Sequence, residues 1–425
     1  MDRFFGIFGI IFILLVAFLM SNNKRAINLK TIGMGFLLQI LLAVFILKTP
    51  LGQIIFGGIG LFIQKILDFA NQGASFLFGP LNNAIKLNEL FGPGSIVFAI
   101  QLMSALILIA VIVNILYYYR IMQRVVAVLG KAMYKLMDVS GAEALSNVAS
   151  SFVGQVMAQF MIKPYLPNLT RSEILASMTG SMACISGGVM ALYVGMGIPA
   201  QYLLAASIMA APGALVISKI VYPEDGQPQT KNEVKISKRR THVNVIDSIA
   251  RGATDGLNVS LKVIGVLLGF VALIAMLDWF LCKFGIFLHN AIHLNLAFVG
   301  LDINHLSMKA IVGKFFAIFA YLMGAPLKDA STVGSLLGTK FILNEMLGYV
   351  DLISIKNVIS DKSFIIASFA LCGFANLSSI AIQIGGIGEI APNQRKNLSR
   401  LGVRALICGT LASYMSACIA GILLG

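Results

Sequence analysis

Charged residues are scarce in this 425-residue sequence, at 12% against roughly a quarter in a typical soluble domain. Hydrophobic residues make up 58%, a share that excludes an ordinary soluble enzyme or binding domain. Cysteines are also few, and their spacing fits neither a disulfide framework nor a metal site. All five lie in apolar segments, so we interpret them as small buried side chains. The composition predicts an all-α polytopic membrane protein.

Basic residues outnumber acidic ones, which gives the chain a net charge of +14. No basic patch interleaved with aromatic residues accompanies this charge, so we expect no nucleic-acid partner. Most of the 32 lysines and arginines lie in short segments between apolar runs, where the positive-inside rule places them in cytoplasmic loops. Neither a nucleophile–base pair nor a group of metal ligands is visible. The sequence therefore predicts a protein that is not an enzyme and has no cofactor.

Eight apolar runs are long enough to cross a bilayer as a helix, which takes about 20 residues. They lie near 4–21, 30–48, 94–118, 173–196, 199–220, 257–283, 363–388 and 401–424. We expect 51–80 to form an amphipathic, glycine-rich helix along the membrane or against a neighbour, and 119–138 to form an interfacial helix on the basic side. Alternating the eight spans places the basic loops in the cytoplasm and both termini outside.

Two more apolar segments are interrupted by polar residues and are too short to cross the bilayer twice; they lie at 141–167 and about 331–355. Irregular backbone at membrane depth must be buried in protein, so each segment favours a re-entrant hairpin. A glycine-rich, interrupted span and then a plain span follow each hairpin. The separations agree, since Ser186 follows Gln155 by 31 positions and Asn376 follows Glu345 by 31 positions. This order predicts an inverted repeat, as in many secondary transporters.

The second interrupted span carries Asn376, Ser379 and Gln383 in the middle of an apolar run. A spanning segment with a broken, polar centre indicates a substrate site near the bilayer midplane. The alternative is that these residues only tighten helix packing. Glu345 is the strongest single candidate, because a charge within the membrane costs at least about 2.5 kcal/mol on insertion scales. Lys340 either pairs with Glu345 or extends toward the membrane surface.

A series of motifs runs in a fixed order from about residue 95 to the C-terminus: Gly154-Gln155, Pro164–Pro167, Thr170–Glu173, Ser186–Gly188, Pro223-Glu224, Gly338–Glu345, Gly373–Ser379 and Gln383–Gly388. Together they resemble the concentrative nucleoside transporter family. The resemblance implies a homotrimer in the bacterial cytoplasmic membrane, with eight spans and two re-entrant hairpins per chain. It also implies a transport body that moves like an elevator past a trimeric scaffold and imports nucleosides by symport.

On this basis the chain divides into four units: N-terminal scaffold helices and an interfacial helix (1–138), a first transport repeat (139–220), a linker with a scaffold helix (221–308) and a second transport repeat (309–425). The resemblance implies that Gln155 contacts the nucleobase and that Glu345, with Asn376 and Ser379, holds the ribose hydroxyls. A carboxylate can indeed accept hydrogen bonds from two adjacent hydroxyls. The resemblance also places Phe374 and Val189 in the pocket lining.

The sequence departs from the family beside Gln155, where a polar pair is usual and Val156 and Met157 stand instead. We infer that base recognition depends more on packing, which favours purine nucleosides; a pyrimidine preference is the alternative. The positions that match the family's sodium site also differ, and they are Ser150, Val153, Cys184 and Ile185. A thiol is a poor ligand for a hard cation.

The coupling ion is therefore expected to be a proton, with sodium as the alternative. Glu345 is the expected carrier, because burial disfavours a charged carboxylate. A channel is the alternative from a different functional class. Channels usually repeat their filter groups by symmetry, whereas one buried glutamate in an inverted repeat favours alternating access.

Overall fold

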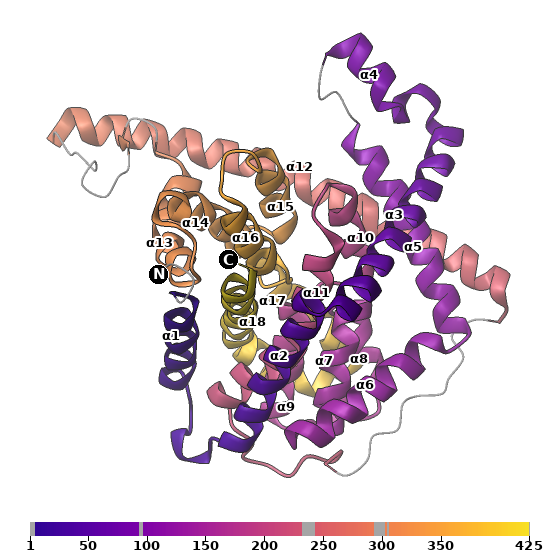
Figure 1. Cartoon of the computed structure of the whole chain (residues 1–425), viewed down its shortest axis with the longest axis vertical. Helices are drawn as coiled ribbons and strands as arrows, with labels where there is room; N and C mark the ends of the chain where they lie inside the picture. The colour runs from indigo at the N-terminus through magenta and orange to yellow at the C-terminus, as the bar shows by residue number, and fades with distance from the viewer. Residues whose placement is uncertain (1–4, 93–96, 232–242, 293–301, 304–305, 425) are drawn as a thin grey trace.

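The computed structural model describes residues 5–92, 97–231, 243–292, 302–303 and 306–424, and the secondary structure of these residues is helical (Figure 1). The α-helices are α1 (Phe5–Leu19), α2 (Leu29–Lys48), α3 (Pro50–Phe78), α4 (Ala84–Phe91), α5 (Phe98–Tyr118), α6 (Ile121–Met137), α7 (Gly141–Val153), α8 (Met157–Met161), α9 (Arg171–Ala183), α10 (Gly187–Gly195), α11 (Ala200–Val221), α12 (Val245–Ile292), α13 (Met308–Leu322), α14 (Leu327–Ile342), α15 (Glu345–Ser354), α16 (Asp361–Leu371), α17 (Leu377–Ile390) and α18 (Arg395–Leu424). The predicted all-α fold is confirmed.

Seven helical stretches among the described residues are long and apolar enough to cross a membrane. Six of them coincide with predicted runs, while the runs at 4–21 and 363–388 take other forms. The first is α1, which has only 15 residues, and the second is divided between α16 and α17. The seventh stretch is Pro50–Phe91, where the sequence predicts an amphipathic helix instead. The buried residues of α3 are two glycines and two alanines, so most of this helix is exposed.

Each predicted hairpin segment consists of two helices joined by a short turn, while its re-entry into the membrane stays a prediction. In the first, residues 154–156 join α7 to α8, and in the second, residues 343–344 join α14 to α15. A broken helix follows each hairpin, since α9 and α10 are separated at 184–186 and α16 and α17 at 372–376. One continuous helix, α11 or α18, completes each set. The chain therefore contains the same series of elements twice.

The two series run in opposite directions. The end of α11 lies beside the start of α9, where Ser172 Oγ donates to the carbonyl of Tyr222 at 2.7 Å. The start of α18 lies at this same end, because Gln394 Nε2 donates to the carbonyl of Leu169 at 3.1 Å. The corresponding helices α11 and α18 are thus antiparallel, as an inverted repeat requires.

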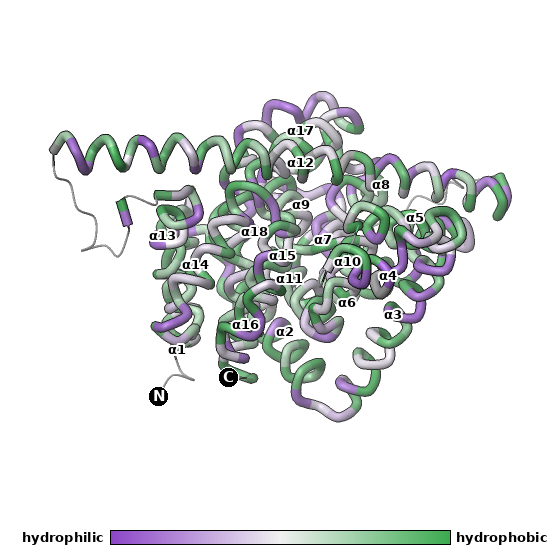
Figure 2. The backbone as a smooth tube through the Cα atoms, turned by 90° about the horizontal axis from the view of Figure 1, so that it is seen from above, coloured by the Kyte–Doolittle hydropathy of each residue, from purple (hydrophilic) through white to green (hydrophobic). Residues whose placement is uncertain are grey.

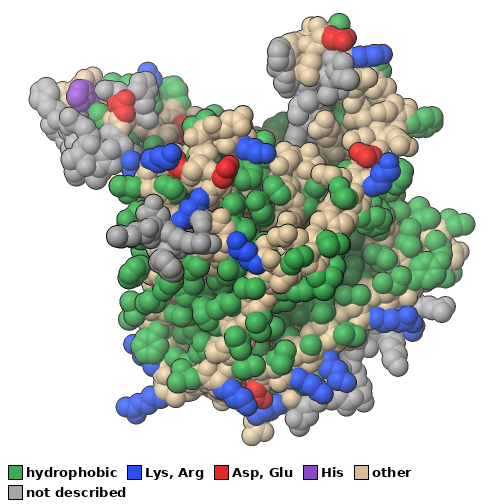
Figure 3. All heavy atoms as spheres, in the orientation of Figure 1, with side chains coloured by type: hydrophobic (Ala, Val, Ile, Leu, Met, Phe, Trp, Pro, Cys, Tyr) green, Lys and Arg blue, Asp and Glu red, His purple; other side chains and the backbone are tan. Residues whose placement is uncertain are grey.

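A broad apolar band covers the face of the molecule shown in Figure 3, and lysine and arginine side chains gather along the lower edge of this view. The two ends of the chain lie together, because a side chain at Gly6 would meet Cys418 and Ile422 of α18. Figure 1 places both ends away from that lower edge. Both termini therefore lie away from the basic edge, as the predicted topology requires. Which edge faces the cytoplasm stays a prediction.

The helices α5 and α12 form a pair outside the two repeats. Gly252 and Gly256 let the two backbones approach closely, since a Cβ at either glycine would lie within 2.7 Å of α5 backbone atoms. The 48-residue helix α12 extends past the rest of the molecule at both ends (Figure 2). In its most apolar stretch 6% of the residues are buried, compared with 89% of the residues in the corresponding stretch of α11. The surface of α12 is therefore exposed, whereas residues 99–118 of α5 are buried or half-buried.

By contrast, α1 and α2 pack on the repeats, α1 against α18 and α2 against α11. Gln39 of α2 reaches the core, where its Nε2 donates to Ser416 Oγ of α18 at 3.0 Å. The predicted division of the chain into four units stays a prediction. In the structure, α1 and α2 pack with the two repeats, and α5 packs with α12.

Candidate substrate-binding site

The interruptions of the two broken helices cross at the centre of the molecule. Gly373 has a φ of +131°, and a Cβ there would lie 2.6 Å from the carbonyl oxygen of Ala183. Only glycine permits both this backbone conformation and this close approach. Backbone groups released by the interruption find partners nearby, since Ser413 Oγ of α18 donates to the carbonyl of Cys372 at 3.0 Å. Such partners are necessary for irregular backbone away from water.

Each second half-helix begins with a polar side chain that caps it. Asn376 Oδ1 accepts from the backbone N–H of Ser379 at 2.9 Å at the start of α17. Ser186 Oγ accepts from the N–H of Val189 at 3.4 Å at the start of α10. The sequence favours these starts because serine and asparagine are preferred helix N-caps. Two helix N-termini, each with partial positive charge, therefore face the centre of the molecule.

The second hairpin brings Glu345 to this centre as the first residue of α15, and Glu345 is 6% exposed. Its carboxylate accepts two hydrogen bonds: one from the Tyr193 hydroxyl at 3.0 Å and one from Asn376 Nδ2 at 3.2 Å. Three elements, α15, α10 and the start of α17, thus supply one polar group each. The structure brings Glu345 and Asn376 together, as the sequence predicts.

The first hairpin brings Gln155 to the first turns of α17. Gln155 Nε2 donates to Ser379 Oγ at 3.1 Å, and Gln155 Oε1 lies 3.5 Å from Gln383 Nε2. Since Ser379 also bonds to the Asn376 cap, the two hairpin turns meet on the first turns of α17. An amide, a hydroxyl and a carboxylate at these positions can both donate to and accept from a polyhydroxylated ligand.

Not every predicted site residue joins this group. Val156 packs on α17, where a Cβ at Gly386 would lie 2.7 Å from its side chain. Met157 is 49% exposed, so the structure does not place it among the buried polar residues. Val189 and Phe374 are half-buried, in the first turn of α10 and in the second interruption.

The positions considered for a coupling cation lie where α7 meets the first interruption; they are Ser150, Val153, Cys184 and Ile185. Several polar groups there bond within the protein. Ser150 Oγ donates to the carbonyl of Ser146 at 2.7 Å, and Cys184 Sγ accepts from Ser151 Oγ at 3.1 Å. The Ile185 carbonyl accepts from a serine of α11. Val153 is the last residue of α7 and is half-buried.

The sequence did not identify Tyr193 as a site residue, and it indicated no hydrogen-bond partner for Gln383. Tyr193 follows Val189 by four residues, so it lies one helical turn further on the same face of α10. Gln383 follows Ser379 by four residues on α17 in the same way. Extending each predicted site residue by one turn would have found both.

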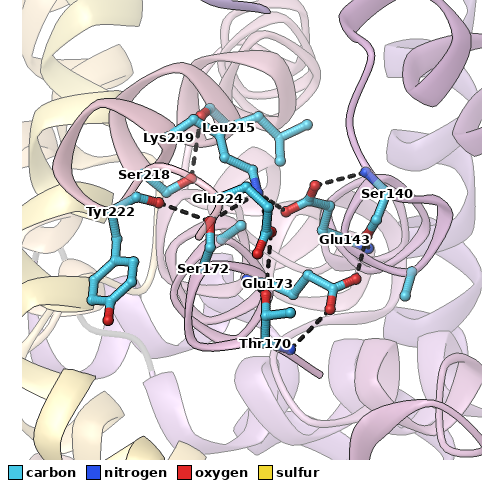
Figure 4. Close-up of polar contacts among 12 residues, drawn as sticks. Ser140, Glu143, Thr170, Ser172, Glu173, Leu215, Ser218, Lys219, Tyr222 and Glu224 are labelled. Atoms are coloured by element: carbon cyan, nitrogen blue, oxygen red, sulfur yellow. Dashed lines mark hydrogen bonds and ion pairs between the residues drawn. The ribbon is translucent and has the colours of Figure 1, made fainter. Parts of the chain in front are cut away.

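A second buried polar cluster lies at the opposite end of the first repeat (Figure 4). Lys219 Nζ forms ion pairs with Glu143 at 2.7 Å and Glu224 at 3.2 Å. Glu143 and Glu173 each complete a capping box, at the starts of α7 and α9, and Ser140 Oγ joins the two boxes by donating to Glu173. These groups satisfy one another, so the cluster joins helix ends and is separate from the central site.

Comparisons with known proteins agree with this geometry. Residues 8–81 and 202–421 match the families described as "Na+ dependent nucleoside transporter" N-terminus and C-terminus, and residues 99–200 match "Nucleoside recognition". The chain is 38% identical to the nucleoside permease NupC of Helicobacter pylori, over 99% of this chain and 98% of that protein. It is 34% identical to sodium/nucleoside cotransporter 1 of Rattus norvegicus, over 98% of this chain and 63% of that protein.

Solved structures show the same fold. A structure described as CNTnw in an inward-facing substrate-bound state matches with a TM-score of 0.92 and 36% identity, over 100% of this chain and 98% of that one. A variant of the same transporter in an outward-facing state also matches, with a TM-score of 0.92 and 36% identity, over 99% and 98% of the two chains. The relatives are transporters and not enzymes. The chain is a multi-pass membrane protein and belongs to the concentrative, sodium-dependent nucleoside transporter family.

Proposed function

We propose that this transporter is a symporter that imports nucleosides, with purine nucleosides favoured, and that Glu345, Asn376, Ser379 and Gln155 bind the substrate. The main support for this proposal is that both hairpin turns contact the start of α17: Gln155 bonds to Ser379, and Glu345 bonds to Asn376. Glu345 and Asn376 would hold the ribose hydroxyls, since a carboxylate accepts hydrogen bonds and an amide both donates and accepts them. Gln155, on the other hairpin, would contact the base.

This arrangement explains how the site could select for ribose. The buried groups bond to one another, and a bound ribose would replace the Asn376–Glu345 bond with its own hydroxyls, while Tyr193 keeps the carboxylate in place. An analogue that lacks a hydroxyl would leave a buried acceptor or donor unpaired, at a cost of about 1–3 kcal/mol. Deoxynucleosides should therefore bind less well than nucleosides.

A proton is the proposed coupling ion, and Glu345 is its proposed carrier. One feature supports a proton over sodium: a thiol, which is a poor ligand for a hard cation, stands at Cys184. Sodium coupling remains the alternative, and the sodium-dependent description of the family favours it.

The purine preference is proposed on narrower grounds. Val156 places an apolar surface beside Gln155 and against α17, which suits the larger face of a purine ring. Met157 does not add to this surface, because it is largely exposed. The alternative is a pyrimidine preference.

An elevator movement on a trimeric scaffold is also a proposal. The α5–α12 pair would be the scaffold, and the two repeats together with α1 and α2 would be the moving body. A crevice of about 980 Å³ with a mostly apolar lining lies between α3, α5 and α12 on one side and α10 and α15 on the other. This boundary and the exposed surface of α12 support two bodies and contacts with other chains. The termini would lie outside a bacterial cytoplasmic membrane.

Uptake into proteoliposomes tests the proposal. The protein is reconstituted, and uptake of labelled adenosine and uridine is measured under an inward proton gradient, an inward sodium gradient, or neither. We expect saturable uptake that only the proton gradient drives, with adenosine preferred. Uptake driven only by sodium would assign the coupling to sodium, and uptake that neither saturates nor follows a gradient would indicate a channel.

A further inference from the structure

Lys340 is buried close to the candidate site but is not part of it. It lies two residues before the end of α14 and is 1% exposed, which makes it one of the largest fully buried side chains. It therefore does not extend to the membrane surface. No ion pair joins it to Glu345 in the described part of the chain. Burying an ammonium group is costly unless it has polar partners, so its position needs an explanation.

The ammonium group of Lys340 donates to the carbonyl of Ala370 at 2.7 Å. Ala370 is the second-last residue of α16, where the interruption leaves carbonyls without helical partners. The C-terminal end of a helix carries partial negative charge, which a nearby cation stabilises. Lys340 thus caps the end of α16 from a different element.

This bond connects the two segments that carry the polar groups of the site. From Lys340 the chain passes through the hairpin turn to Glu345, and from Ala370 it passes through the interruption to Asn376. Glu345 and Asn376 are themselves hydrogen-bonded at 3.2 Å. The Lys340 contact therefore fixes the spacing of the segments on which Glu345 and Asn376 are mounted.

The first repeat makes the corresponding connection without a charge. There Ser150 of α7 lies near the turn of the first hairpin, and its Oγ is 3.0 Å from Ser181 Oγ in the last turn of α9. In that repeat, two short neutral side chains are sufficient to join the first hairpin to the half-helix α9. The second repeat uses a charged side chain at the equivalent place, beside the one carboxylate of the site.

We propose that Lys340 is a positioning residue for nucleoside recognition: by capping α16 it holds Glu345 and Asn376 in the geometry that distinguishes ribose from deoxyribose. This proposal rests on the assignment of Glu345 and Asn376 to the sugar. It assigns to Lys340 an effect on selectivity rather than on folding alone.

The test compares adenosine with 3′-deoxyadenosine as competitors of labelled adenosine binding to purified, folded protein. We expect the native protein to prefer adenosine by at least about tenfold, equivalent to about 1.4 kcal/mol. In Lys340→Met this preference should fall to about twofold or less. Lys219→Met is the matched control, because it removes a buried lysine from the distant cluster of Figure 4 and should keep the native preference.

Lys340→Met with the native preference would overturn the proposal, whatever its stability. If that variant does not fold, Lys340→Gln is compared instead, since its side chain is polar but is one atom shorter and carries no charge to stabilise the end of α16. Lys340→Gln should lose most of the preference, and native preference would again contradict the proposal. Glu345→Gln separates the two assignments: it should abolish adenosine binding, and a variant that still binds adenosine with the native preference would show that the sugar site itself is wrong.

Discussion

At the scale of single residues, the site depends on hydrogen bonds to one carboxylate, that of Glu345. Its donors come from different helices, and the Tyr193 ring is held by Tyr349, with ring centroids 4.3 Å apart. The Tyr349 hydroxyl in turn donates to the carbonyl of Ser368 at 2.8 Å. Closely packed, tilted aromatic rings with anchored hydroxyls limit the freedom of the Tyr193 donor.

Tyr193→Phe should therefore weaken nucleoside binding while leaving the fold intact. A hydrogen bond to a charged group contributes about 1.5–3 kcal/mol, so we expect a loss of affinity of about tenfold or more. Binding to purified protein is the measurement. Tyr222→Phe is the control, because Tyr222 lies at the distant end of α11. Equal affinities for native protein and Tyr193→Phe would remove Tyr193 from the site.

Gly373 allows a second prediction at this scale. Its φ of +131° and the nearby Ala183 carbonyl leave no space for a side chain. Gly373→Ala should lower stability by about 1–3 kcal/mol or more, which a lower melting temperature in detergent would show. Gly385→Ala is the matched control, since nothing lies within 4 Å of a Cβ there. A Gly373→Ala melting temperature equal to the control would contradict the crossing described above.

The sequence indicated some site residues better than others for a physical reason. Glu345, Asn376 and Gln383 are polar within apolar runs, and burial of a polar group requires a partner. Tyr193 is amphipathic and common in membrane helices, so it gave no such signal. Met157 was assigned by its place beside Gln155, but the start of α8 directs it outward.

At the scale of elements, the two hairpins are anchored differently at their bases. The second uses one carboxylate, Asp329, whose oxygen accepts from Ser360 Oγ at 2.6 Å and from Ser363 Oγ at 2.7 Å. The first uses the ion-paired cluster around Lys219 (Figure 4). The base of the first hairpin thus depends on an ion pair, and that of the second on hydrogen bonds to one carboxylate.

Lys219→Met should destabilise the protein, because it leaves Glu143 buried without its cation. Removing one partner of a buried pair costs about 3–5 kcal/mol. The double variant with Glu143→Gln should recover part of that loss, since the fully buried carboxylate is then neutral; Glu224, the other partner of Lys219, is partly exposed. Melting temperatures of the native, single and double variants test this. A double variant no more stable than the single one would show that Glu143 and Lys219 are not coupled.

Repeat order and hairpin positions followed from sequence because interrupted apolar segments have few stable alternatives in a membrane. The division of each broken helix into two short helices also followed from its polar centre. The form of Pro50–Phe91 did not follow, because a glycine-rich, amphipathic helix suits both a surface and a neighbouring helix. Its contacts depend on distant elements, α5 and α11.

At the scale of the whole molecule, the proposed movement requires the crevice between α12 and α15 to change shape. Cysteines at Leu268 and Leu347 would face this crevice from its two sides, in a background with the half-buried Cys282 replaced by alanine. A bifunctional maleimide that joins them should stop uptake but leave nucleoside binding unchanged.

Cysteines at Leu268 and Ala105 provide the control for this experiment. Both line the crevice, but they lie on α12 and α5, which form one pair. Joining them should leave uptake unchanged. Native uptake after joining α12 to α15 would contradict a movement between the two bodies.

Family membership and the all-α fold followed from sequence, because motif order and apolar length are local properties. The grouping of α1 and α2 with the repeats did not, since it depends on long-range contacts such as that between Gln39 and Ser416. The exposed surface of α12 likewise becomes visible only when the helices are placed in space.

The measurement that tests the account most directly is nucleoside uptake by Glu345→Gln in proteoliposomes, beside Glu389→Gln as a control at an exposed position on α17. The account predicts that Glu345→Gln folds but neither binds nor transports nucleosides, because its carboxylate is the acceptor for the sugar. Glu389→Gln should transport as the native protein does. Native uptake by Glu345→Gln would contradict the proposed site.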